Sequence, residues 1–259
     1  MPSKGTSGCS SQCNSSWSKE DRAILFLGPK GSGKSRLIND VFGNPNGGPC
    51  EESHSIRQGT SDIGVISLPK ARGNWLLIDT PGLDGSNSLS TTESVATTLD
   101  HLRQKHNVKV SAVAFVTTAH AKSHTQDLDI LGLIVGQQKA DMIIFCIKFM
   151  QTGDASESVE TKQHDFQKHI KRHYPGAAKS MFLPLICKGV RPTENAPKIL
   201  DFAQGRDSEG ELEVVREMQK NDGKWKNTAV GKHLLKRASA TDRFIGGYWS
   251  FSPAFNLSY

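Results

Sequence analysis

The chain of 259 residues lacks long hydrophobic runs and internal repeats, and it contains few cysteines. No apolar stretch approaches the roughly 18–20 residues that a membrane-spanning helix needs, and the first residues lack the hydrophobic core of a secretory signal. The five cysteines are an odd number, and Cys146 and Cys187 lie inside apolar runs, so we expect reduced thiols and no disulfide framework. These absences predict a soluble, cytoplasmic protein.

Charged residues are also modest in number, at 22% of the chain. Lysine and arginine together exceed aspartate and glutamate by 32 to 26, which gives a formal net charge of +6. This mild excess favours an anionic partner such as a nucleotide, a membrane surface or nucleic acid, without choosing among them. The chain carries no motif specific for nucleic acid, and its length suits one α/β domain with extensions.

The most informative segment follows an apolar run at residues 23–27 and precedes a helical pattern that begins near Arg36. It reads Gly28-Pro29-Lys30-Gly31-Ser32-Gly33-Lys34-Ser35, which has the spacing and the strand–loop–helix context of a phosphate-binding P-loop. Its glycines let backbone N–H groups wrap a phosphate chain at the positive end of a helix. We expect Lys34 to bind the β- and γ-phosphates and the Ser35 hydroxyl to ligate Mg²⁺. The whole segment, with Arg36, is the predicted nucleotide-binding loop.

A second motif, Asp79-Thr80-Pro81-Gly82, follows the apolar run at residues 75–78. An apolar strand at this place delivers Asp79 to the carboxyl edge of the sheet, where open α/β sheets bind their ligands. We expect Asp79 to hold Mg²⁺ through a water molecule. The Gly82 amide is expected to hydrogen-bond the γ-phosphate and to sense its loss.

Together the two motifs resemble those of the translation-factor-related class of GTPases. The order that follows is an apolar strand at 111–116, a polar loop, an apolar helix through Val135 and a strand at 142–147. This order is similar to that of the GIMAP proteins of immunity and the chloroplast outer-envelope import receptors, over about residues 23–185. The resemblance implies binding of GTP or GDP with Mg²⁺, a switch function and nucleotide-dependent homodimerisation.

The first switch of such a GTPase is expected between Cys50 and Asp62. A threonine there completes the Mg²⁺ shell in the triphosphate state and releases the metal after hydrolysis. Thr60 is the preferred candidate, and Ser55 and Ser61 are alternatives. The predicted metal site therefore consists of Ser35, Thr60 and Asp79.

Base recognition is less clearly encoded. GTPases usually end the next-to-last strand with Asn or Thr, then Lys, any residue and Asp. Lys148 fits the lysine position, but Met150 stands where aspartate is usual. The sequence therefore leaves open whether the site prefers guanine or adenine. Phe149 is either a stacking partner for the base or a core residue, and Asp154 is a further candidate. Residues 188–189, Lys-Gly, fall where a backbone contact to the base is expected.

The residue after the second motif bears on hydrolysis. Leu83 occupies the place where fast small GTPases carry a water-orienting glutamine, and a leucine cannot polarise water. We expect slow hydrolysis, or hydrolysis stimulated when a dimer partner supplies a residue or excludes water. Arg57, His120 and His124 are candidates for that residue.

The predicted fold is a three-layer α/β P-loop NTPase with a mostly parallel central sheet. Its one antiparallel pair comes from a hairpin of residues 63–68 and 75–78. The predicted division is a disordered tail at 1–20, a nucleotide-binding G domain at 21–190 and a helical extension at 191–259, packed on or beside the G domain.

The extension is expected to contain helices at 211–219 and 228–238. The second is basic, and it is either packed on the nucleotide domain or available to a membrane surface or a partner.

Two other functions remain open from the sequence. A P-loop phosphotransferase acting on a small acceptor is one, because Met150 removes the usual guanine determinant. A scaffold that binds nucleotide without turning it over is the other, because of Leu83.

Overall fold

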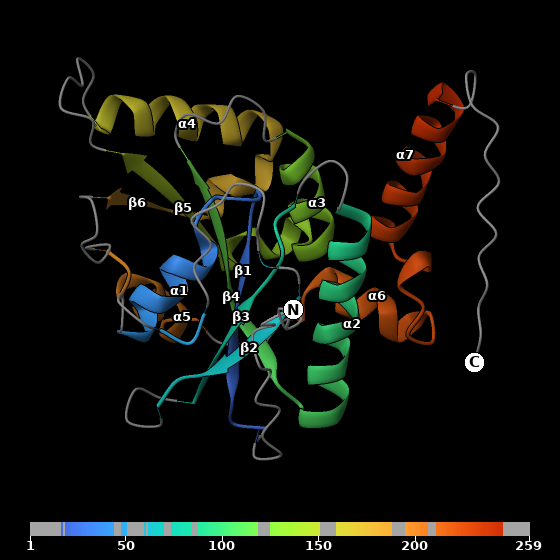
Figure 1. Cartoon of the computed structure of the whole chain (residues 1–259), viewed down its shortest axis with the longest axis horizontal. Coiled ribbons are helices and arrows are strands. Elements are labelled where there is room, and N and C mark those ends of the chain that lie inside the picture. Colours follow the sequence, from blue (N-terminus) through green and yellow to red (C-terminus); the bar gives the residue numbers. More distant parts are fainter. Residues whose placement is uncertain are drawn as a thin grey trace, which may run out of the picture.

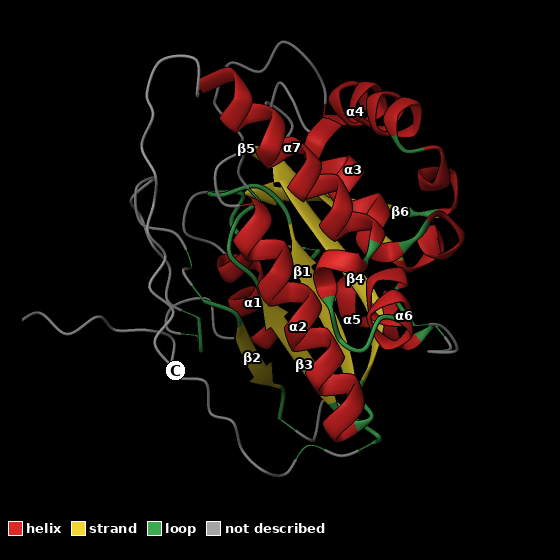
Figure 2. Cartoon of the chain, turned by 90° about the vertical axis from the view of Figure 1, so that its right-hand side faces the viewer, coloured by secondary structure: helices red, strands yellow, loops and turns green. Residues whose placement is uncertain are grey.

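The computed structural model of the chain describes residues 17, 19–43, 48–50, 60, 62–69, 74–83, 88–118, 125–150, 159–187, 195–206 and 211–245. Six strands form one sheet in the order β2-β3-β1-β4-β5-β6, and helices cover both of its faces (Figures 1 and 2). Only the β2–β3 pair is antiparallel, and the other four pairs are parallel. The predicted three-layer α/β fold with one antiparallel pair is therefore confirmed.

The bounds of the described elements follow. The strands are β1 (Arg22–Leu27), β2 (Gly64–Ser67), β3 (Trp75–Asp79), β4 (Lys109–Thr118), β5 (Ile143–Met150) and β6 (Met181–Cys187). The α-helices are α1 (Lys34–Phe42), α2 (Ser88–His106), α3 (Thr125–Val135), α4 (Val159–His173), α5 (Lys198–Gln204), α6 (Glu213–Lys220) and α7 (Ala229–Ile245). Short 3₁₀ helices are η2 (Gln137–Met142), η3 (Pro175–Lys179) and η4 (Trp225–Asn227).

The central strands are apolar on both faces. Every residue of β1 after Arg22 is buried, and so is every residue of β3. In β4 all residues except the two at its ends are buried. A parallel sheet with helices on both faces has this near-continuous hydrophobic pattern, because neither face meets water. The edge strand β2 instead alternates between buried and more exposed residues.

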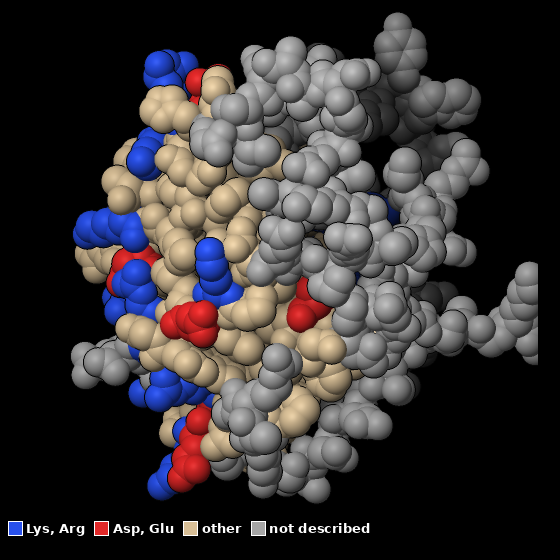
Figure 3. All heavy atoms as spheres, turned by 90° about the vertical axis from the view of Figure 1, so that its left-hand side faces the viewer, with Lys and Arg blue, Asp and Glu red and all other residues tan. Residues whose placement is uncertain are grey.

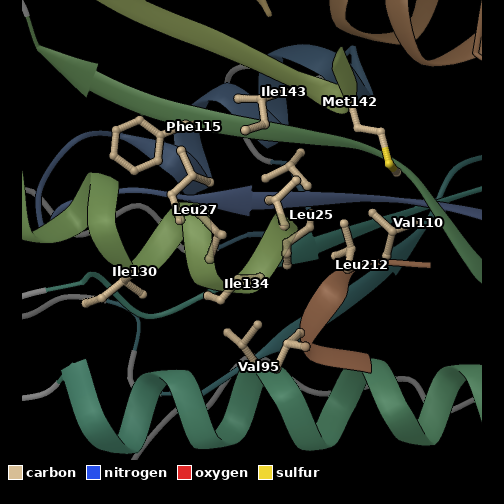
Figure 4. Packing of buried hydrophobic residues seen from close by; sticks show 14 of the residues in the cluster. Leu25, Leu27, Val95, Val110, Phe115, Ile130, Ile134, Met142, Ile143 and Leu212 are labelled. Atoms are coloured by element: carbon tan, nitrogen blue, oxygen red, sulfur yellow. The ribbon is translucent and has the colours of Figure 1, made fainter. Parts of the chain in front are cut away.

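Two hydrophobic clusters, one on each face, hold the helices to the sheet. Alternate residues of β1 divide between them: Ile24 and Phe26 face α1 and α5, whereas Leu25 and Leu27 face the helices on the other side. Figure 4 shows this second cluster, in which side chains of β1, β4, α2 and α3 meet Leu212 at the start of α6. The second face is covered by α2, α3, α4, α6 and α7.

The C-terminal helices share these two clusters. α5 contributes Ile199, Leu200 and Ala203 on the α1 face, and α6 and α7 contribute to the opposite face. The division of the chain near residue 190 stays a prediction.

Several predicted elements have different lengths in the structure. β4 and β5 extend further than their apolar runs, and α7 continues to Ile245 instead of ending at 238. Helix α5, which is short and follows Pro197, was not predicted from the sequence. None of the described helices combines the length and the apolar composition needed to cross a membrane.

Most of the predicted tail, residues 1–16 and 18, lies outside the described part of the chain. Trp17 is described: its ring meets the ring of His106 edge-on at 5.2 Å, and its Nε1 donates a hydrogen bond of 3.3 Å to Ser67 Oγ.

Candidate functional site

The two sequence motifs meet at the carboxyl edge of the sheet. Parallel pairing sets Phe26 beside Asp79, so the loop after β1 and the end of β3 are neighbours. An isolated bridge between Pro29 and Leu83, with the Leu83 N–H donating to Gly28 O at 3.0 Å, continues this pairing beyond the strands. Strand register thus holds the predicted P-loop and the Asp79 motif together.

The loop after β1 has the backbone conformation of a phosphate cradle. Gly28, Gly31 and Gly33 have φ angles of 142°, 75° and 85°, which residues with a side chain rarely adopt. A Cβ at Gly28 would lie 2.1 Å from Val116 O of the neighbouring strand. The loop then enters α1 directly, where Leu37 N–H donates to Gly33 O at 3.0 Å. The N-terminal N–H groups of α1 therefore face the loop, as anion binding requires.

Lys34, the first residue of α1, is buried at this loop. Its Nζ donates hydrogen bonds of 3.2 Å to both Gly28 O and Pro29 O. Burial lowers the pKa of Lys34 from 10.5 to about 8, although the carboxylates of Asp79 and Asp127 act in the opposite direction. A desolvated ammonium group that donates to carbonyl oxygens is suited to accept an anionic ligand.

The three predicted metal ligands lie in one cluster. Ser35 Oγ donates a 2.7 Å hydrogen bond to Asp79 Oδ2 and lies 3.1 Å from Thr60 Oγ1. Burial raises the pKa of the Asp79 carboxyl, while Ser35, Lys34 and Cys50 oppose that rise. The other carboxyl oxygen, Oδ1, is buried and has no hydrogen-bond partner among the described residues. Two hydroxyls and a carboxylate form a donor set that suits Mg²⁺, so these residues fit the metal.

Gly82 and Leu83 lie against the loop. A Cβ at Gly82 would lie 2.3 Å from Lys30 Cα, so the backbone of the second motif touches the P-loop. The preceding Thr80 is fully buried, and its hydroxyl donates to Phe26 O at 2.6 Å, which fixes the turn. The side chain of Leu83 is buried in the hydrophobic cluster on the α2 face.

Strand β5 places its two candidate base-binding residues, Lys148 and Phe149, on opposite faces of the sheet. Alternation along the strand sends Phe149 into the hydrophobic cluster, where it is 4% exposed, so the stacking role considered for Phe149 is wrong. Lys148 points to the other face and reaches the P-loop: a Cβ at Gly33 would lie 2.2 Å from Lys148 Nζ. The side chain of Met150 lies outside the described part of the structure.

The remaining predicted loop residues differ in exposure. Lys30 and Gly31 are exposed, Arg36 is half-buried, and Ser32 is buried with a hydroxyl that has no partner among the described residues. Other candidates lie outside the described residues, namely Ser55, Arg57, Ser61, His120, His124, Asp154, Lys188 and Gly189.

Sequence reasoning missed two polar residues at this site. Asn39, one helical turn after Ser35, is 1% exposed and hydrogen-bonds the backbone of Cys50. Asp127, in the first turn of α3, contributes its charge to the environment of Lys34. The signal for Asn39 was present, because a polar residue on the buried side of an amphipathic helix needs a partner.

The fold and site together define a P-loop nucleotide-binding protein. A family model described as 50S ribosome-binding GTPase matches residues 23–185, and the chain belongs to this family. No sequence among the curated proteins matches the chain.

Solved structures of similar fold include Toc33 from Arabidopsis thaliana. Toc33 in complex with Mg²⁺ and GMPPNP is 16% identical, with a TM-score of 0.52 over 73% of this chain and 87% of that chain. Toc33 in complex with GDP and Mg²⁺ is 16% identical, with a TM-score of 0.53 and the same coverage. A third structure, from the chloroplast translocon components atToc33 and psToc159, is 17% identical, with a TM-score of 0.54 over 73% of this chain and 85% of that chain. For those components, dimerization is important for the GTPase activity.

Proposed function

We propose that this chain is a Mg²⁺-dependent GTP-binding switch that hydrolyses GTP slowly. One observation carries the proposal: beside the P-loop, the Ser35 hydroxyl lies within hydrogen-bond distance of both Thr60 and Asp79. Membership of a GTPase family and the guanine nucleotides and Mg²⁺ in the Toc33 complexes support the choice of ligand.

Each residue has a definite task in this proposal. Lys34 exchanges the carbonyl oxygens of Gly28 and Pro29 for phosphate oxygens, which satisfy its charge better. Ser35 and Thr60 would hold Mg²⁺ through their hydroxyl oxygens, and Asp79 would hold it through a water molecule. When bound, Mg²⁺ neutralises charge on the β- and γ-phosphates. The Gly82 amide, held against Lys30, donates to the γ-phosphate and loses that bond after hydrolysis.

Slow turnover follows from Leu83, whose side chain is buried in the hydrophobic cluster and cannot orient a water molecule. The same observation favours a second candidate, a scaffold that binds nucleotide without hydrolysing it.

Homodimerisation across the nucleotide face is part of the proposal, and the importance of dimerization for the Toc components supports it. The phosphotransferase alternative is not favoured, because the family match is to GTPases.

Preference for guanine is proposed on the family match and on Lys148. Its ammonium group lies beside Gly33, where its side chain can pack along the base of a nucleotide bound in the P-loop.

We also propose a cytoplasmic protein that contacts a membrane surface through α7. Lys232, Leu235 and Lys236 are exposed on that helix, and Leu235 is the large hydrophobic side chain most exposed among the described residues. A basic helix face with an apolar residue suits an anionic lipid surface.

Calorimetric titration with GTP, GDP and ATP in the presence of Mg²⁺ tests the main proposal. We expect the wild-type protein to bind GTP and GDP in preference to ATP. The Lys34→Ala variant should lose at least tenfold in affinity, because charged hydrogen bonds to phosphate contribute about 1.5–3 kcal/mol each. Lys139→Ala, in η2 and away from the P-loop, is the matched control and should bind as the wild type does. A preference for ATP, or unchanged binding by Lys34→Ala, would overturn the proposal.

A further inference from the structure

Helix α1 contacts the chain on both sides of the segment 51–59, which lies outside the described residues. At one end, Asn39 Nδ2 donates to Cys50 O at 2.9 Å, and Cys50 N–H donates to Asn39 Oδ1 at 3.0 Å. At the other end, Ser35 Oγ lies 3.1 Å from Thr60 Oγ1. Ser35 and Asn39 are four residues apart and therefore neighbours on one face of the helix.

The Asn39 side-chain amide exchanges two hydrogen bonds with the backbone of Cys50, as two paired residues of neighbouring antiparallel strands do. Because the Cys50 N–H can only donate and the Cys50 carbonyl can only accept, the two bonds fix the orientation of the Asn39 amide. The packing around the amide is tight: a Cβ at Gly48 would lie 2.3 Å from Asn39 Oδ1. The side chain of Cys50 in turn acts to lower the pKa of the Asp79 carboxyl, against the effect of burial. Asn39 therefore connects the P-loop helix to the chain that leads into the predicted first switch.

The two contacts differ in what the metal does to them. Ser35 and Thr60 are proposed metal ligands, so their mutual contact changes when Mg²⁺ binds or leaves. The two bonds between Asn39 and Cys50 join the Asn39 amide to backbone groups of Cys50, and no proposed metal ligand takes part in those two bonds. Its contact can persist in both nucleotide states.

We propose that Asn39 is a positioning residue that anchors the first switch in every nucleotide state, and so holds Thr60 within reach of Mg²⁺. This inference rests on the proposed function. Without the anchor, the last point that α1 holds before Thr60 would be the end of that helix, and the connection from there to Thr60 spans residues 44–59 instead of 51–59. The longer loop alone lowers the chance that Thr60 meets the metal about twofold. Loss of two buried hydrogen bonds adds to this, and together we expect about a tenfold effect.

The test follows the release of a fluorescent GDP and of a fluorescent non-hydrolysable GTP analogue at increasing Mg²⁺ concentration. In Asn39→Ala we expect the Mg²⁺ concentration that half-maximally slows release of the analogue to rise about tenfold. Release in EDTA, which reports the P-loop without metal, should stay within about twofold of the wild-type rate. Asn221→Ala is the matched control, because Asn221 Nδ2 also donates to a backbone carbonyl, that of Glu217, on α6. It should leave both rates unchanged.

A double mutant separates positioning from general loss of structure. If Asn39 acts through Thr60, the variant carrying both Asn39→Ala and Thr60→Ala should need no more Mg²⁺ than Thr60→Ala alone. Additive effects would contradict the inference. A wild-type protein that releases nucleotide at the same rate with and without Mg²⁺ contradicts the proposed function itself. A wild type that responds to Mg²⁺, with Asn39→Ala responding identically, contradicts only the anchor.

A measurement on the wild-type chain does not depend on whether a variant folds. Amide hydrogen exchange read by NMR should show the Cys50 N–H protected like the interior amides of α1, with GDP and with the GTP analogue alike. Fast exchange of this amide in either state would show that Asn39 is no permanent anchor.

Discussion

Lys34 illustrates how a single residue at this site opposes folding. Burial lowers its pKa from 10.5 to about 8, even though Asp79 on β3 and Asp127 on α3 attract the ammonium group. This lowering means that the charged form of Lys34 destabilises the folded state by roughly 3 kcal/mol. A bound polyphosphate supplies the negative charge that the nucleotide-free loop lacks, so the ligand should stabilise the fold.

The sign of the pH dependence follows from this lowered pKa. Between pH 8 and about 10.5 the unfolded lysine keeps its proton while the folded one loses it, so stability should rise with pH in that window. Below pH 8 the cost is constant.

We therefore predict that the nucleotide-free protein gains up to about 3 kcal/mol from Lys34 between pH 8 and 10.5. Urea unfolding of the wild type and of Lys34→Met at several pH values measures this as the difference between the two proteins. Lys34→Met removes the charge but keeps much of the side-chain volume, so other titrating groups cancel in the comparison. A difference that does not change with pH would contradict the prediction.

At the scale of elements, helix α2, which follows the Asp79 motif, is joined to the C-terminal part of the chain around α6 and η4. Trp225 Nε1 of η4 donates to Glu93 Oε1 of α2 at 2.6 Å, and Arg103 of α2 pairs with Glu211 just before α6. The buried ring of Trp225 belongs to the same hydrophobic cluster as α2 and α3. α6, α7 and α2 therefore form one packed layer on this face of the sheet (Figure 2).

The exposed side of α7 is where we predict a lipid contact. Sedimentation with vesicles of phosphatidylserine and phosphatidylcholine should exceed that with phosphatidylcholine alone, because each lysine near an anionic surface contributes about 1 kcal/mol. The double change Lys232→Glu and Lys236→Glu should abolish the difference, and added salt should weaken it.

The matched control reverses two exposed lysines of α4, Lys168→Glu and Lys171→Glu, which change the net charge equally. If both double variants lose binding to the same degree, the attraction comes from net charge and α7 has no special role.

At the scale of the whole molecule, the described part of the face that bears α1 and α5 carries charges of both signs. Figure 3 shows lysine and arginine interspersed with aspartate and glutamate over the described part of that face. The described part of this face therefore shows no continuous basic surface.

Dimerisation is the other property of the whole molecule that we predict. Light scattering should show mostly monomer with GDP and a larger dimer fraction with a non-hydrolysable GTP analogue, each with Mg²⁺. The expected reason is that the γ-phosphate is bound by Gly82 and, through Mg²⁺, by Thr60, so that both present one surface to a second copy. Equal monomer fractions in the two nucleotide states, measured over the same range of protein concentration, would count against this prediction.

The sequence was sufficient for the order and type of most elements. Apolar runs of strand length between helical patterns predicted the α/β architecture, and the hairpin before Asp79 predicted the antiparallel pair. Two elements were not predicted correctly from the sequence. α5 is too short to show a clear helical period. β5 continues through a polar and aromatic end, which the apolar pattern does not indicate. Nothing in the spacing of Asn39 and Cys50 indicates that they meet, because their contact depends on how the chain returns to α1.

The sequence by itself determined the P-loop, because a phosphate cradle is built from consecutive backbone groups and needs glycines at fixed spacing. It also determined that Asp79 ends a strand. Only the tertiary structure decided that Phe149 is core while Lys148 faces the loop, and that Ser35, Thr60 and Asp79 share one cluster. The physical reason is that these contacts join segments far apart in the chain, and strand register and helix packing fix which side chains meet.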